Sequence, residues 1–244
     1  MTNKGSNSPR KAIREEIQTF LTQKGEDRWK YFSASIFIHW QIMIEDFVPR
    51  YLSGRVLDDG CGYAPYLEII NKHSKELILL DHLISHPEIN VCSDVRNLPF
   101  ENGSFDCVLC LQVLEHVDNP FEAMQEIGRA LRPGGILLLS VPHLSRLHEL
   151  PHDYFRYTEN GLRELARCAD LEVLELKPTG GMVAFLGHQI SVAFLTGLWK
   201  IKFFRSLLLK INKVFFTRLL ATVDGVIGMQ SLFPQGYAMV AKKR

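Results

Sequence analysis

The chain has 244 residues, of which 46% are hydrophobic and 23% are charged, and its formal net charge is +1. This balance is ordinary for a globular protein, and it excludes a disordered chain, a collagen, a coiled coil and a multispan membrane protein. Because the net charge is close to zero, we expect no nucleic-acid partner. The five cysteines are irregularly spaced and no signal peptide is visible, so we expect a reducing, cytoplasmic location.

Residues 1–54 are predicted to form a helical segment ahead of the main domain. Ile13, Ile17 and Phe20 recur at helical spacing. Residues 28–49 are predicted to form a second helical stretch, which is crowded with aromatic side chains.

From residue 55 onward, short apolar runs alternate with helical patterns. Continuous rather than alternating apolar runs are typical of strands that are covered on both faces. The best-marked helix is capped by Asn119, opened by Pro120 and continued to Leu131. The sequence therefore predicts an α/β fold with a doubly wound, mostly parallel seven-stranded sheet and a ligand at the carboxyl ends of its strands. The predicted strands are 55–58, 77–81, 90–93, 105–110, 136–141, 171–176 and 237–242.

A turn with two glycines follows the first predicted strand, in the sequence VLDDGCGYAP. Gly60 and Gly62 allow a tight turn in which backbone N–H groups approach a ligand closely. Pro65 stands where a dinucleotide fingerprint needs glycine or alanine, which disfavours a nicotinamide oxidoreductase. Asp81 ends the next strand, where α/β nucleotide sites place a carboxylate against the ribose, and Asp94 follows the third strand.

The stretch from Val56 to Val141 resembles the class I S-adenosylmethionine-dependent methyltransferases of the broad type 11 group. The matching pieces are VLDDGCG, LLDHL, SDVRNLPFENGSFDCVLCLQVLEHV and ALRPGGILLLSVP, in that order. The resemblance implies a Rossmann-like fold and S-adenosylmethionine as the cofactor. The cofactor-binding residues that it implies are Asp58, Gly60, Cys61 through its backbone N–H and Gly62 at the methionine end, Asp81 at the ribose with His82 beside it, Asp94 and Val95 at the adenine, and Leu111 and Gln112 at the methyl-donor pocket.

Three nearby features need separate explanations. The family usually has an apolar residue where this chain has Asp59, and a buried unpaired carboxylate is costly, so we expect Asp59 to be exposed or paired. Cys107 and Cys110 lie on a predicted strand, so their side chains point to opposite faces and form neither a metal pair nor a redox pair. Glu115 and His116 are expected to shape the pocket rather than to transfer a proton.

Residues 148–152 read HELPH, which matches a zinc-protease motif that requires a helix. A proline inside this segment would break the helix, so we expect no metal and predict a loop after the fifth strand. The loop resembles the PHDYxRYT segment of methyltransferases from surface-glycan and lipid pathways. His143 and His152 are the candidate general bases, because a histidine with a pKa of about 6.5 can accept a hydroxyl proton. The alternative is a rim loop that is pinned by contacts between Asp153 and Arg156.

An insert at 182–235 separates the α/β domain, at 55–181, from its last strand, at 236–244. The insert begins with 18 uncharged residues, whereas a membrane span needs about 20 apolar ones. We expect either a peripheral membrane contact through 182–223, which contains no acidic residue, or a lid or dimer face. The predicted helix places Phe204, Leu207, Leu208, Ile211, Val214 and Phe215 on one face and Lys202, Arg205, Lys210 and Lys213 on the other.

The predicted function is methyl transfer from S-adenosylmethionine to a small-molecule or lipid-linked acceptor, in the cytoplasm or at the inner face of the membrane. Methyl transfer is an in-line displacement, so the protein mainly orients the two reactants and excludes water. The alternative is a non-catalytic binding protein that keeps the methyltransferase fold and is anchored at a membrane or a partner. The intact set of glycines and acids disfavours this alternative.

Overall fold

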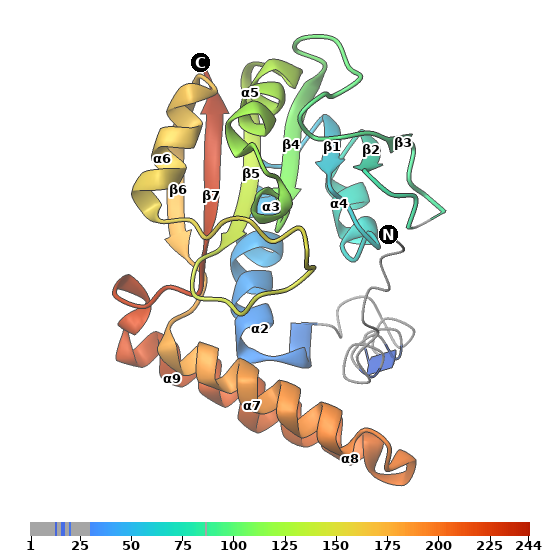
Figure 1. Ribbon diagram of the computed structural model, residues 1–244, viewed down its shortest axis with the longest axis vertical. Coiled ribbons are helices and arrows are strands. Elements are labelled where there is room, and N and C mark those ends of the chain that lie inside the picture. The colour runs from blue at the N-terminus through green and yellow to red at the C-terminus, as the bar shows by residue number, and fades with distance from the viewer. Residues whose placement is uncertain (1–12, 14–15, 18–19, 21–29, 86) are drawn as a thin grey trace.

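The structure, a computed structural model, describes residues 13, 16–17, 20, 30–85 and 87–244 (Figure 1). Seven strands form one sheet in the order β3-β2-β1-β4-β5-β7-β6. β7 runs antiparallel to β5 and β6, and the other pairs are parallel, which confirms the predicted sheet. The strands are β1 (Arg55–Asp59), β2 (Glu76–Asp81), β3 (Val91–Cys92), β4 (Phe105–Leu111), β5 (Leu131–Pro142), β6 (Leu171–Pro178) and β7 (Gly236–Lys243).

One predicted boundary was wrong. Helix α5 (Pro120–Ala130) has the predicted cap, because the side chain of Asn119 accepts the N–H of Glu122. Leu131, however, is not helical. It pairs with Phe105 of β4 and is the first residue of β5, so the helix ends one residue earlier than its apolar pattern suggests.

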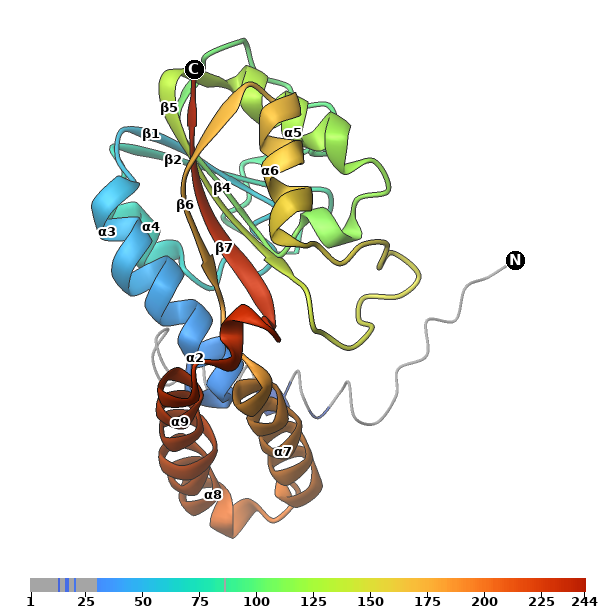
Figure 2. The same ribbon diagram turned by 90° about the vertical axis from the view of Figure 1, so that its left-hand side faces the viewer.

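Helices α5 and α6 cover one face of the sheet, and α3 and α4 cover the other (Figure 2). Alternate side chains of the strands pack into two cores on these opposite faces. Leu57 and Leu139 belong to the core under α5 and α6, whereas Val56 and Leu138 belong to the core under α4 and the N-terminal helix. The remaining helices of these layers are α6 (Glu159–Cys168), α4 (Leu67–His73), α2 (Ala34–Trp40), η2 (Gln41–Phe47) and α3 (Val48–Tyr51).

The two cysteines of the CxxC pattern lie in different cores. Cys107 is buried on the α4 face and Cys110 on the α5 face, and both thiols are free. The prediction that they point to opposite faces is therefore confirmed.

The predicted helix at 28–49 is present as a continuous run of α2, η2 and α3, capped by the hydroxyl of Ser33. Ile13, Ile17 and Phe20 are helical as predicted, and Ile17 is fully buried. The rest of that first predicted helix lies outside the described residues.

The insert is helical and lies at the end of the sheet where the parallel strands finish (Figure 2). α7 packs against η5 and α9. Asp224 of α9 is buried and caps α7, because its carboxylate accepts the N–H groups of Gly181 and Ala184 at 2.7 and 3.0 Å. The elements of the insert are α7 (Met182–Leu198), η4 (Lys202–Phe204), α8 (Arg205–Ile211), η5 (Asn212–Leu219), α9 (Leu220–Ile227) and η6 (Met229–Ser231).

The insert packs on the N-terminal segment. The Asn212 side chain donates to the carbonyls of Tyr31 and Phe32 at 2.9 and 3.0 Å, and the Ser35 hydroxyl donates to the carbonyl of Ala184. Among the described residues, no helix is both long and apolar enough to cross a membrane.

Candidate functional site

A cavity of about 900 Å³ lies at the carboxyl ends of the parallel strands. The strand order reverses between β1 and β4, and α/β sheets bind ligands in the crevice outside such a reversal. One wall comes from the turns after β1, β2, β3 and β4, and the opposite wall comes from the 142–158 loop with α2 and α7. The cavity therefore has one wall built by the sheet, through the turns at its strand ends, and a second wall built by the 142–158 loop, α2 and α7.

The glycine turn after β1 is folded back onto β2. Gly60 has φ +84°, and an added Cβ there would lie 2.3 Å from Cγ2 of Val113. Its N–H and the N–H of Cys61 both donate to the carbonyl of Leu80, at 2.9 and 3.0 Å. The structure thus gives the Cys61 N–H an internal acceptor, and Cys61 does not line the cavity, contrary to its predicted place at the ligand.

Asp81 stands at the cavity wall in a fixed orientation. One carboxylate oxygen accepts the N–H of Gly62 at 2.8 Å, and the other accepts the N–H of Leu83 at 3.0 Å. The Nδ1 atom of His82 lies 3.0 Å from the second oxygen. A carboxylate offers about four lone-pair sites, so these contacts orient Asp81 without using its full capacity.

Asp58 and Asp59, at the end of β1, are both buried. Burial, followed by the nearby charge of Asp81, raises the pKa of Asp58 to about 7. Asp58 does not line the cavity, whereas Asp59 borders it.

The expectation that Asp59 would be exposed or paired was wrong. Its side chain is fully buried, and neither carboxyl oxygen has a hydrogen-bond partner among the described residues. Burial raises the pKa of Asp59 well above its usual range, and the charges of Asp58, Asp81 and Asp94 raise it further. The environment of Asp59 therefore favours its neutral form, because a buried charge without a partner is costly.

Asp94 and Val95 border the cavity after β3. The guanidinium of Arg96 contacts both oxygens of Asp94 and also pairs with Asp118, so the pKa of the Asp94 carboxyl is held below its usual value. This pairing by Arg96 was not predictable from the sequence, since an arginine in a polar loop is usually solvated.

Gln112 has φ +58°, and its side-chain amide donates to the Ser140 hydroxyl at 3.2 Å. The same hydroxyl lies 2.9 Å from Nε2 of His39, and burial lowers the pKa of His39 to about 4. Gln112 and His39 line the cavity, whereas Leu111 packs into the core beneath it. His39 was not predicted to be a site residue, although a lone histidine in an aromatic-rich helix could have indicated one.

The 142–158 loop is an ordered part of the wall. Asp153 and Arg156 form the two-point contact proposed for it, at 2.6 and 2.8 Å. His152 lines the cavity, with its Nδ1 3.0 Å from the hydroxyl of Tyr154. His143 does not line it, because its Nδ1 donates to the carbonyl of Tyr157. Of the two predicted bases, only His152 is placed for contact with a ligand.

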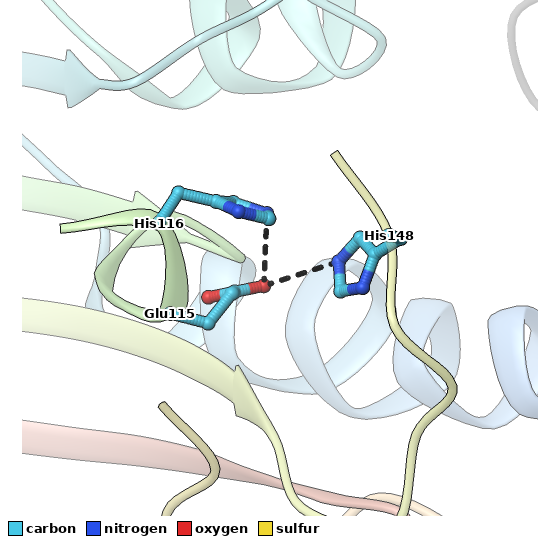
Figure 3. Close-up of side chains that lie close together, drawn as sticks. All are labelled: Glu115, His116 and His148. Atoms are coloured by element: carbon cyan, nitrogen blue, oxygen red, sulfur yellow. Dashed lines mark ion pairs between the residues drawn. The ribbon is translucent and has the colours of Figure 1, made fainter. Parts of the chain in front are cut away.

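The HELPH segment forms a turn, as predicted, and does not pair its two histidines in a helical arrangement. Instead, His148 meets Glu115 and His116 of η3 (Leu114–His116), as Figure 3 shows. Nε2 of His116 and Nε2 of His148 lie 3.7 and 3.8 Å from the same oxygen of Glu115. Both histidines line the cavity, while Glu115 is fully buried. No role was predicted for His148, and its contact with η3 was not predicted either.

Comparison with known proteins identifies the fold and the family. A family model described as "Methyltransferase domain" matches residues 11–176, about two thirds of the chain. A "probable S-adenosylmethionine-dependent methyltransferase" of Mycolicibacterium smegmatis is 26% identical over 58% of this chain and 60% of its own length. A tRNA U34 carboxymethyltransferase of Campylobacter curvus is 26% identical over 58% of this chain and 48% of its own length. The matches thus span about half to three fifths of these relatives.

A solved structure covers almost the whole chain. It is the 1,6-didemethyltoxoflavin N1-methyltransferase of Burkholderia thailandensis, with bound S-adenosylhomocysteine, and it covers 99% of this chain and 93% of its own. Its TM-score is 0.54 at 16% identity, which shows a shared fold. Given the family match, this fold and a crevice at the strand reversal, the chain belongs to the class I S-adenosylmethionine-dependent methyltransferases, whose cofactor is S-adenosylmethionine.

Proposed function

We propose that this protein transfers a methyl group from S-adenosylmethionine to an acceptor bound in the same cavity. The observation that carries the proposal is the cavity at the strand reversal, with Asp81 oriented at its wall by two backbone N–H groups. S-adenosylmethionine supplies the methyl group on a sulfonium centre. The protein supplies orientation and an enclosure from which water is excluded, which is what an in-line displacement needs most.

The cofactor occupies the wall built by the sheet. Asp81 and His82 bind the ribose, and Asp94 with Val95 borders the adenine. Gly60 and Gly62 of the glycine turn, which line the cavity, and Gln112 face the methionine end. Asp58 acts from beneath the turn, since it is buried below the cavity lining rather than in it.

The acceptor is a small molecule bound against the opposite wall. Ligand pockets usually have volumes of about 300–1,000 Å³, so 900 Å³ is large for one ligand and has room for a cofactor and a compact acceptor. His152 is the candidate base for an acceptor hydroxyl. The similarity to a tRNA-modifying enzyme of Campylobacter curvus makes RNA the competing acceptor class. The net charge of +1 favours the small molecule.

Titration calorimetry tests the cofactor half of this proposal. S-adenosylmethionine and S-adenosylhomocysteine should each bind with one site per chain, and NAD should not bind. Release of S-adenosylhomocysteine in the presence of an acceptor panel then tests turnover. A chain that binds NAD but neither sulfur ligand would contradict the proposal, and one that binds both sulfur ligands without turnover on any acceptor would favour a non-catalytic binding protein.

We also propose that the insert brings the protein to an anionic lipid surface, where a lipid-linked acceptor would be presented. Apolar side chains remain exposed on it, including Phe203 (91% exposed), Leu207 (51%) and Phe215 (53%). Lys202 and Lys210 are exposed beside them. Apolar anchors next to lysines suit an interface with anionic headgroups.

The predicted amphipathic pattern was only partly right. Leu208 is buried rather than on the exposed apolar face. Two of the predicted surface cations contact the protein, because Arg205 pairs with Glu16 and Lys213 lies 3.8 Å from the ring centroid of Tyr31. Any electrostatic contribution to lipid binding should therefore come from the lysines that remain exposed.

Sedimentation with vesicles tests the lipid contact. The wild type should pellet with anionic vesicles at low salt, and binding should weaken when Lys202 and Lys210 are changed to Glu. Changing Lys213 to Glu should have a smaller effect, because its side chain faces Tyr31. A wild type that stays in the supernatant at low salt would show that the insert serves as a lid or an interface between chains.

A further inference from the structure

We propose that Glu115, His116 and His148 bind one divalent transition-metal ion at the wall of the cavity, with an open coordination position toward the acceptor. The three side chains come from η3 and from the 142–158 loop, and their ligand atoms lie within 4.8 Å of one another. One carboxylate and two imidazoles are a ligand set that suits zinc, iron and cobalt ions better than magnesium or calcium.

The distances are close to those of a bound site. Metal–ligand bonds of about 2.0–2.2 Å place the ligands of a tetrahedral ion about 3.3–3.6 Å apart. The two histidine Nε2 atoms lie 3.7 and 3.8 Å from the Glu115 oxygen. Figure 3 shows both rings turned toward that oxygen. Because all the ligand atoms lie within 4.8 Å of one another, binding requires them to approach by at most about 1.5 Å.

Both histidines are held in the form that a metal needs. Nδ1 of His116 lies 2.6 Å from the carbonyl of His152, and Nδ1 of His148 lies 3.2 Å from the carbonyl of Arg146. A carbonyl oxygen can only accept, so each Nδ1 carries a proton, and in the neutral ring the lone pair is then on Nε2. Metal-ligating histidines are typically fixed in this way by a backbone carbonyl or a carboxylate. The carboxylate of Asp153, 3.7 Å from Nδ1 of His148, reinforces the same arrangement.

The buried carboxylate of Glu115 is independent evidence for a bound cation. Its side chain is fully buried, and neither carboxyl oxygen has a hydrogen-bond partner among the described residues. A buried polar atom without a partner is costly and needs an explanation. A cation bound between the three groups would be the missing partner of the Glu115 oxygen that faces both histidines.

The position of the cluster gives the ion a role that rests on the proposed methyl transfer. His116 and His148 line the cavity, and their side chains remain about a quarter exposed, at 23% and 26%. Three protein ligands and an open position are typical of a catalytic rather than a structural site. A hydroxyl bound there would lose its proton more readily. Its oxygen would then bond to the methyl carbon as the carbon–sulfur bond breaks, with the electron pair staying on sulfur and the proton passing to His152 or water.

Calorimetry and cobalt spectroscopy test the site on the full chain after treatment with a chelator. Zn²⁺ should bind with one site per chain, and Co²⁺ should give the visible absorption of a four- or five-coordinate ion. His116→Ala, His148→Ala and Glu115→Gln should each weaken Zn²⁺ binding at least tenfold. His73→Ala is the matched control, because His73 lies on α4 away from the cavity and should leave binding unchanged.

The outcomes separate this proposal from the proposed function. Zn²⁺ binding that is absent, or that survives all three substitutions, would overturn the metal site. His148 lies on a loop, so His148→Ala keeps the test valid if Glu115→Gln fails to fold. S-adenosylmethionine binding to the chelated protein should be unchanged, because none of the residues proposed to bind the cofactor is a ligand in the cluster. Its loss in the wild type would count against the cofactor site, whatever the metal result.

Discussion

Replacing Gly60 by alanine should be far more harmful than the same change at Gly62, although both residues lie in one turn with positive φ. An L-residue in this conformation costs roughly 1–2 kcal/mol at either position. At Gly62 nothing lies within 4 Å of the new Cβ, so this strain is the whole cost. At Gly60 the Cβ would also lie 2.3 Å from the stiff side chain of Val113, and such overpacking adds roughly 1–3 kcal/mol.

A double-mutant cycle isolates the second cost. Val113→Ala removes both methyl groups that the new Cβ would meet, so Gly60→Ala should cost only about 1–2 kcal/mol in that background. Urea denaturation measures the free energy of unfolding of the four chains, with Gly62→Ala as the control for backbone strain. Equal costs at Gly60 and Gly62, or no coupling between Gly60 and Val113, would refute this account of the turn.

Three further outcomes are expected. Asp81→Asn keeps one acceptor for the turn but removes the charge, so the affinity for S-adenosylmethionine in calorimetry should fall at least tenfold, about 1.4 kcal/mol; unchanged affinity would remove Asp81 from the site. The pKa of Asp59 is raised in the folded state, so the wild type loses stability as the pH rises above about 4. The free energy of unfolding in urea should therefore be higher for Asp59→Asn than for the wild type, by a difference that grows from pH 4 to pH 8. His39 has its pKa lowered to about 4, so the wild type should lose up to about 3 kcal/mol relative to His39→Gln between pH 6.5 and 4; parallel profiles would show that His39 is not buried as a neutral ring.

The sheet and the cofactor wall were predictable because the place of a residue relative to the end of a strand determines where it lies in the sheet. The parallel strands all finish at one edge, so residues that directly follow successive strands must meet there. Asp81 ends β2 and Asp94 follows β3, and both border the cavity. The family resemblance added Gln112, which also borders the cavity, and Asp58 and Leu111, which lie one layer deeper, because side chains alternate at a strand end and only one of two neighbours can face the ligand.

The acceptor wall was not predictable, because no local pattern records which loop folds onto which. His148 meets η3 because the 142–158 loop is tied there, with the N–H of Tyr154 donating to the carbonyl of Glu115 at 2.8 Å. The HELPH pattern indicated a partner four residues away, whereas the observed partners are more than thirty residues away. The prediction for Asp59 was wrong for a related reason: the sequence shows an acidic side chain but not the burial that raises its pKa.

The insert and its flanking residues add to the lining of the cavity from beyond the stretch that matches the family. The family match ends at residue 176, and the cavity residues Thr179, Phe185 and Gln235 all come later in the chain. On the proposed function, the acceptor wall therefore has two parts: the 142–158 loop lies inside the matched stretch, whereas 179–236 lies beyond it. Exchange of 179–236 for the corresponding stretch of a relative should change the acceptor preference while leaving the affinity for S-adenosylmethionine unchanged, and directed evolution of specificity should find substitutions there.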